Sequence, residues 1–255
     1  MSGAAAVVRI ELRLLRHDPV PAVVLIAMPV VLMTLLSDAM EATLAEEGYA
    51  DAAGSAQTVP GMACVFAFFA IALVGFALFR EHGWRTWPRL RAAGLSGQAV
   101  LAGKLAVPAG LLLAQAVLLF GFGVLALDLE VTGSWLAVAL VAAAFGAMVL
   151  VAGLAAAAAL GTIQQVNAVT NLGAMVAGGL GGGFVPVSAL PSWIEPLAPV
   201  SPVYWAMEGY RAAVLDGGGV ADVAGPVAVL ALFGAALSAV ALWRLRLDVP
   251  KRAWG

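Results

Sequence analysis

The residue types that most often carry out catalysis are scarce in this sequence. It has two histidines, His17 and His82, and one cysteine, Cys64. Hydrolysis within a membrane needs a nucleophile with a base in reach, or a metal with histidine and carboxylate ligands. The apolar stretches contain no HExxH motif and no paired aspartates, and the fragment GLSG at 94–97 lies in a basic segment without a nearby helical histidine. The sequence therefore argues against an enzyme and predicts no metal site.

A glycine cluster, GGLGGG at 178–183, is the feature closest to a phosphate-binding loop. No Gly-Lys-Ser/Thr follows it, and it lies in an apolar stretch rather than between a strand and a helix. In membrane helices small residues instead allow close packing or a hinge. We therefore expect this chain to bind no cofactor of its own.

Ionisable and amide side chains within the apolar stretches are the next candidates. Ionisable groups at the bilayer centre usually mark ion coupling. The one inside a stretch, Lys104, lies near the start of 99–126, where its side chain can snorkel to the surface. This argues against a proton-driven or sodium-driven carrier. Gln115, Asn167 and Asn171 are candidates to line a translocation path, while hydrogen bonding between helices is the alternative favoured for any single residue.

The positions of these residues depend on six long apolar stretches, each able to cross a hydrocarbon core that needs about 20 apolar residues. We place them at 20–37, 60–79, 99–126, 135–160, 166–187 and 223–243. The chain of 255 residues is 63% hydrophobic and only 11% charged, which excludes a soluble domain. The predicted fold is an all-α polytopic membrane protein forming one transmembrane domain over 1–255.

Basic residues indicate the orientation of these spans. Every Lys and Arg except Arg211 falls at segment ends that one orientation places on the same side. The positive-inside rule makes that side the cytoplasm, with both termini in it and the spans in the plasma membrane. The short basic loops are better explained as topology signals than as sites for nucleic acid.

Two cytoplasmic segments have further character. In 4–17, Arg9, Arg13 and Arg16 share one helical face and apolar side chains occupy the opposite face, which is typical of a helix lying on the bilayer surface. A merely solvated leader is the alternative. The loop 80–98 mixes arginines with tryptophans, which suit the membrane interface.

The outer segment 188–222 combines prolines with one helical pattern. Proline fixes φ and withholds a backbone donor, so the first half must form turns and short helices. A run compatible with a helix follows at about 203–215, where Glu208 and Arg211 stand at i and i+3, close enough to pair. We favour a structural role for this pair over contact with a ligand.

Three segments together resemble the permease subunit of ABC type-2 exporters, of the branch that exports drugs and natural products. They are VVRIELRLLRHDP, REHGWRTWPRLRAAGLSGQAVLAGKL and FVPVSALPSWIEPLAPVSPVYWAMEGYRAAVLDG. In the second segment Glu81, Gly83, Leu90, Leu95, Ser96, Gly103 and Lys104 follow the family's pattern, whereas Trp84 and Gly94 depart from it. In the third, Pro191, Trp193, Glu208 and Arg211 are among the residues that follow the family's order.

The resemblance implies a mechanism. Segment 4–17 would be a connecting helix along the inner surface, and 80–98 would hold a coupling helix that docks on a separate ABC ATP-binding subunit carrying ATP and Mg. The expected coupling residues are Glu81, Gly83, Arg85, Arg89, Arg91, Leu95 and Lys104. Short re-entrant helices would precede the last span, and a second permease copy, identical or related, would complete the transporter.

The leading hypothesis is export of an amphiphilic small molecule, antibiotic or peptide, since the spans lack buried charge near their centres. Export of a polysaccharide or lipid-linked glycan is a second hypothesis, which predicts an aromatic groove that the spans do not visibly supply. A scaffold or sensor subunit that transports nothing is a third hypothesis, and it needs no ATP-hydrolysing partner.

Overall fold

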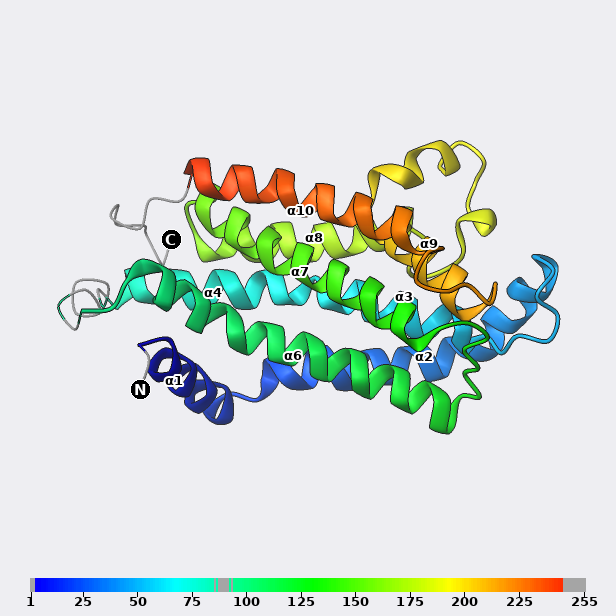
Figure 1. Cartoon of the computed structure of the whole chain (residues 1–255), viewed down its shortest axis with the longest axis horizontal. Helices are drawn as coiled ribbons and strands as arrows, with labels where there is room; N and C mark the ends of the chain where they lie inside the picture. Colours follow the sequence, from blue (N-terminus) through cyan, green and yellow to red (C-terminus); the bar gives the residue numbers. More distant parts are fainter. Residues whose placement is uncertain (1–2, 85, 87–91, 93, 245–255) are drawn as a thin grey trace.

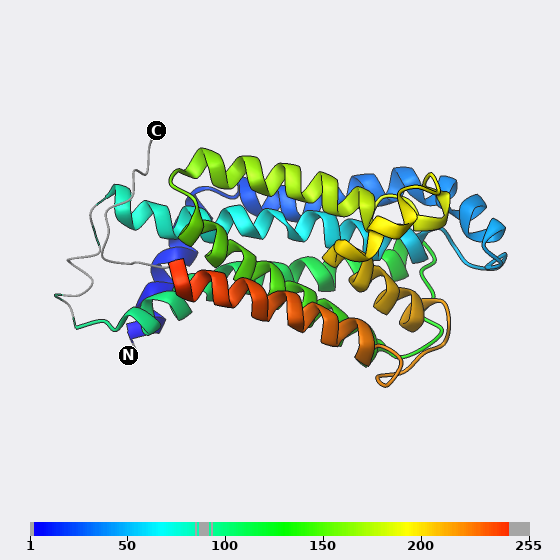
Figure 2. The same ribbon diagram turned by 90° about the horizontal axis from the view of Figure 1, so that it is seen from above.

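The computed structural model describes residues 3–84, 86, 92 and 94–244, and every regular element in this part of the chain is a helix. Its helices are α1 (Gly3–His17), α2 (Val20–Glu46), α3 (Ser55–Ala67), α4 (Phe69–Gly83), α6 (Gly97–Ala126), α7 (Trp135–Ala159), α8 (Ile163–Leu180), α9 (Pro202–Val214) and α10 (Ala224–Arg244). Two short 3₁₀ helices, η1 (Val187–Ala189) and η2 (Glu195–Val200), precede α9. The long helices lie side by side, and α1 lies across one end of the bundle (Figure 1; Figure 2).

Five segments of the described chain are long and apolar enough to cross a membrane. They are Ala22–Glu46, Ser55–Glu81, Gly97–Ala126, Trp135–Ala159 and Ala224–Arg244. The protein is therefore a multi-pass membrane protein. The sixth predicted span, 166–187, falls largely on α8, which is not among the five because it carries four amide side chains, Gln164, Gln165, Asn167 and Asn171. Helix α8 nevertheless runs along the bundle and packs against α4 (Figure 2). A sixth span at this position therefore stays a prediction.

Helix ends differ from the predicted spans where local chemistry sets them. The second helix continues past residue 37 to Glu46, because no glycine or proline follows Pro29 until Gly48. Gly48 has a φ of +96°, a left-handed conformation that ends the helix at little steric cost. The stretch predicted at 60–79 begins earlier, at Ser55, and is divided at Phe68 into α3 and α4.

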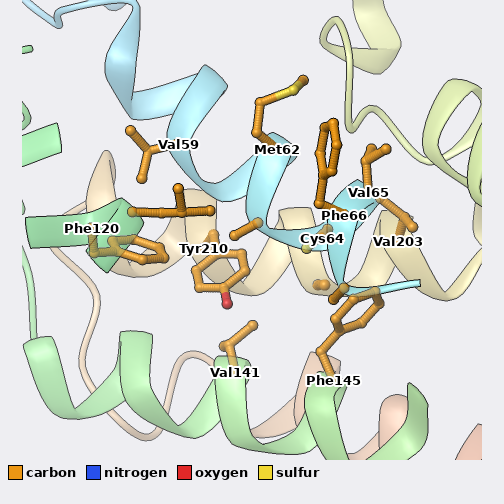
Figure 3. Packing of buried hydrophobic residues seen from close by; sticks show 14 of the residues in the cluster. Val59, Met62, Cys64, Val65, Phe66, Phe120, Val141, Phe145, Val203 and Tyr210 are labelled. Carbon is orange, nitrogen blue, oxygen red and sulfur yellow. The ribbon is translucent and has the colours of Figure 1, made fainter. Parts of the chain in front are cut away.

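The centre of the bundle is α3, in which every residue is buried. Side chains of α7 and α9, among them Val141, Phe145 and Tyr210, point toward it (Figure 3). Lipid tails are as apolar as these side chains, so close packing rather than exclusion of water stabilises such an interior. Packing is close at Gly61, where a Cβ would lie 2.1 Å from the carbonyl oxygen of Gly183. The glycine cluster thus brings the chain after α8 against α3.

Candidate functional site

A buried cluster of charged side chains joins α1, α4 and α6 at the end of the bundle where α1 lies. The Lys104 Nζ donates hydrogen bonds to Glu11 Oε1 at 3.0 Å, Glu81 Oε1 at 2.7 Å and the Ala77 carbonyl at 2.8 Å. Arg80 Nη2 pairs with the other Glu11 oxygen at 2.5 Å. Lys104 is only 2% exposed. One ammonium group therefore ties the leader helix to two helices of the bundle.

The composition of this cluster explains how it can be buried. An ammonium has three N–H donors, and each of those of Lys104 has an acceptor. Two carboxylates balance two cations, so no charge in the cluster lacks a counter-charge. Burial of an ion pair is tolerated when geometry is good and hydrogen bonding complete, whereas loss of one member leaves an uncompensated charge. The cluster should therefore act as a single unit.

Gly103 allows the helices to approach closely enough for this cluster to form. A Cβ at Gly103 would lie 2.6 Å from the Cβ of Val7 and 3.0 Å from the Ala4 carbonyl oxygen. The absence of a side chain there lets α1 cross α6 in contact. Glu11, one helical turn after Val7, then reaches Lys104, the residue after Gly103. Gly103 thus lets α1 and α6 cross in contact, and Lys104 then forms the ion pair that fastens them.

The entry into α6 is built by a turn and a cap. Gly94 has a φ of +75°, which proline cannot adopt, and this accounts for glycine at this position of the segment. The Ser96 hydroxyl accepts a hydrogen bond from the Ala99 N–H at 3.2 Å and caps the helix. Leu95 packs against a second apolar cluster that includes Val100. At the end of α4, the Thr86 hydroxyl hydrogen-bonds with Glu81.

Two of the predicted coupling residues, Glu81 and Lys104, meet in this cluster. Gly83 ends α4, and Arg85, Arg89 and Arg91 lie outside the described residues. The expectation that Lys104 snorkels to the surface is wrong, because its ammonium is buried and fully hydrogen-bonded within the protein.

The leader contributes to the cluster through a residue that the sequence analysis missed. Arg9, Arg13 and Arg16 are all exposed, whereas Glu11 is 8% exposed. At 100° per residue Glu11 falls in the middle of the apolar face of α1. An acid on the apolar side of a basic helix was the available signal for a buried cationic partner.

The three candidate path residues do not share one surface. Gln115 is 2% exposed inside the chain, and its Nε2 has no hydrogen-bond partner among the described residues. Asn167 is half-buried and Asn171 exposed, one turn apart on α8. Only the two asparagines therefore lie together.

A second polar network closes the opposite end of the bundle. Arg211 of α9 forms its ion pair with Glu47, at 2.9 Å, and stacks over the Tyr49 ring, 5.0 Å from its centre. The Arg211 Nε donates to the Tyr49 hydroxyl at 3.3 Å, and that hydroxyl donates to Asp216 at 2.5 Å. The bond to Asp216 raises the pKa of Tyr49 above 10.0. These contacts hold α9 to the end of α2.

The predicted pairing of Arg211 with Glu208 is thus replaced by a pair with Glu47, among the described residues. Arg211 pairs with Glu47, which the tertiary fold brings from the end of α2, rather than with the carboxylate one turn away on its own helix. The Ser188 hydroxyl hydrogen-bonds with the same Glu47 and adds η1 to the network. Pro191 and Trp193 are exposed and lie outside it.

Comparison with known families identifies the class of protein to which this architecture belongs. Residues 5–215 match the family model described as ABC-2 type transporter, which spans α1 through α9. The chain belongs to this family and is the membrane component of an ABC-2 type transporter. Such a permease domain carries no ATPase site and binds no cofactor, and ABC-2 permeases work with ATP-binding subunits. A search of curated proteins found no significant match.

Proposed function

We propose that this chain is the membrane subunit of an ATP-driven exporter that moves an amphiphilic small molecule, antibiotic or peptide out of the cytoplasm or inner leaflet. The buried Lys104 cluster is the observation that carries the coupling part of this proposal. It fastens α1, α4 and α6 together beside the loop 80–98, at which an ATP-binding subunit with ATP and Mg would dock. Both chain termini face the cytoplasm in this arrangement.

Motion would pass through this cluster as follows. Force applied to 80–98 reaches Glu81 at the end of α4, and Lys104 transmits it to α6 and, through Glu11, to α1. Because all three acceptors hold one ammonium, the helices shift together rather than separately. ATP binding and release then select between two arrangements of the bundle, each with its own affinity for cargo.

The exposed face of α8 supports a second copy of the permease, identical or related. Asn171 is exposed on a helix that lies along the bundle, between large exposed apolar residues such as Leu172 and Met175. An amide facing lipid lacks hydrogen-bond partners, which makes exposure of this face unfavourable. A partner helix would cover it and enclose Asn167 and Asn171 in a path between the two subunits.

The composition of this face favours an amphiphilic cargo. A few amides among aliphatic side chains suit a molecule with a small polar part and a larger apolar part. Polysaccharide or lipid-linked glycan export would call for aromatic stacking surfaces, and the sequence of α8 holds no aromatic residue. A scaffold or sensor would not require the Lys104 cluster to lie beside a docking loop.

The test is ATP-dependent movement of a fluorescent amphiphile into proteoliposomes that contain the permease and its ATP-binding subunit. Glu81→Gln keeps an oxygen acceptor for the Lys104 ammonium, so it should still assemble, although with reduced stability, but it should lose most coupled ATP hydrolysis and transport. Glu46→Gln, an exposed acid at the opposite end of the bundle, is the matched control and should behave as the unchanged protein. Equal transport by both variants would overturn the coupling role, and movement of glycans alone would overturn the cargo class.

A further inference from the structure

A cavity of about 360 Å³ opens between α1, α4 and α6 beside the Lys104 cluster. Its walls are aliphatic and aromatic, with Leu73 and Phe76 from α4 and Val107 and Leu111 from α6. This volume lies within the range of ligand sites in proteins. The walls continue along both helices away from the charges, so the cavity has one polar end and one apolar end.

The polar end holds the neutral Lys104 cluster, in which Glu11 and Glu81 balance Arg80 and Lys104, and one further carboxylate, that of Asp18. Glu11 and Asp18 line the cavity together with Arg80 and Lys104. Lys104 uses all its donors within the cluster, whereas the Arg80 guanidinium has five N–H donors and bonds to Glu11 through Nη2. The Arg80 side chain is 22% exposed, although its Nε is buried. Asp18 is exposed and accepts one bond, from the Val20 N–H at 3.3 Å. One cation and one carboxylate therefore retain hydrogen-bonding capacity at the cavity wall.

The polar end also lies where a headgroup would be. The Arg80 guanidinium stands 5.6 Å from the centre of the Trp84 ring, and Trp84 is 57% exposed. Exposed tryptophan at the end of a membrane helix is typical of the bilayer interface. The apolar walls, one to two turns deeper on α4 and α6, are then at the level of acyl chains.

We propose that this cavity binds a zwitterionic phospholipid of the phosphatidylethanolamine type. Its phosphate would accept hydrogen bonds from Arg80, its ammonium would face Asp18, and the upper part of an acyl chain would lie along Phe76, Val107 and Leu111. A net anionic headgroup would meet the Asp18 carboxylate without a counter-charge, so this extra carboxylate favours the zwitterion. Such a lipid would brace α1 against the bundle from the membrane side.

The test is native mass spectrometry of the full chain, purified from nanodiscs holding equal amounts of phosphatidylethanolamine and phosphatidylglycerol. We expect retention of phosphatidylethanolamine in preference to phosphatidylglycerol. Val107→Trp fills the cavity and should abolish retention. Ala106→Trp, on the exposed side of the same helix, is the matched control and should retain the lipid. Equal retention by the two tryptophan variants would overturn the proposed site.

A second variant tests the headgroup separately from the cavity. Asp18→Asn keeps an acceptor for the Val20 N–H but removes the charge, so the preference for phosphatidylethanolamine should fall about tenfold, the effect of losing one charge-assisted contact. An unchanged preference would overturn the zwitterionic assignment. Asp51→Asn, an exposed acid near the opposite end, should have no effect.

Binding in this proposal does not depend on export, because it is measured without an ATP-binding subunit. The same chemistry could come from a resident lipid or from a transported amphiphile. Adding the ATP-binding subunit and ATP distinguishes them: a resident lipid stays bound, and cargo is released. Either result supports the binding site and shows whether its ligand is a resident lipid or cargo. Absence of bound lipid in the unchanged protein would contradict the proposed site.

Discussion

At the residue scale, Lys104 bears more on the arrangement of helices than any other side chain of the charged cluster. Its ammonium contacts α1 through Glu11 and α4 through both Glu81 and the Ala77 carbonyl. All three partners accept hydrogen bonds from this ammonium, so without Lys104 none of them can bond to another. Substitution of Lys104 alone should therefore lower stability more than substitution of Lys104 together with an acidic partner.

Lys104→Met should leave two buried carboxylates without their shared cation and lower the free energy of unfolding by about 3–5 kcal/mol. Thermal unfolding of the purified protein in detergent would measure this loss. The double variant Lys104→Met, Glu81→Gln keeps Glu11 paired with Arg80, removes the imbalance and should recover much of the lost stability. A single variant as stable as the unchanged protein would show that the cluster is not held by charge.

Tyr49 provides a second prediction, based on pH. The hydrogen bond to Asp216 raises the pKa of Tyr49 above 10.0. The phenolate absorbance, taken as the difference between the unchanged protein and Tyr49→Phe, should therefore titrate above pH 10. Asp216→Asn should move that midpoint downward. A midpoint that Asp216→Asn does not alter would contradict the hydrogen bond.

The same shift has a consequence for stability. A group whose pKa is higher in the folded state than in the unfolded state stabilises the fold at any pH at which the group is protonated in both states. The stabilisation from Tyr49 is therefore complete below about pH 10, the ordinary tyrosine value, and is lost as pH rises through the raised pKa. At neutral pH it should be constant.

At the element scale, the crossing of α1 over α6 depends on one glycine. Gly103→Val would place a side chain against Val7 and the Ala4 carbonyl, and overpacking of this kind costs about 1–3 kcal/mol. The variant should melt at a lower temperature and expose α1 to trypsin. Gly110→Val, on the same helix with open space around it, is the control and should resemble the unchanged protein. Equal protease resistance in both variants would argue against this crossing.

Local patterns identified elements better than they identified contacts between elements. The apolar runs of α6 and α7 are long and uninterrupted, so their positions follow from composition, and Ser96 caps α6 as its residue type favours. The pairs Glu11 with Lys104 and Glu47 with Arg211 join residues far apart in the chain, which no spacing rule can reveal. The Glu208 prediction failed for the same reason, since the nearest acid in sequence was not the nearest in space.

At the scale of the whole molecule, α1 and the final turn of α10 lie at one end of the bundle, and η1, η2 and α9 lie toward the other (Figure 1). The positive-inside rule predicts that the first end is cytoplasmic. A cysteine at Ala50, an exposed residue of the α2–α3 connection, should then react with an impermeant thiol reagent in intact cells. Cys64→Ala is a suitable background because Cys64 is buried among apolar side chains.

Labelling of that cysteine only after the cells are opened would reverse the orientation. A cysteine at Gly97, at the start of α6, gives the converse control and should react only in opened cells. Together the two positions test the proposed arrangement of both ends of the bundle without reference to any substrate.

The most direct measurement is affinity purification of the tagged chain from its native membrane in mild detergent, with an assay for ATP hydrolysis. We predict a stoichiometric ATP-hydrolysing partner that is retained by the unchanged protein and by Glu81→Gln but is stimulated by the permease only in the unchanged protein. If no ATP-hydrolysing protein accompanies a permease that remains folded, the chain does not act as a subunit coupled to ATP hydrolysis through the Lys104 cluster.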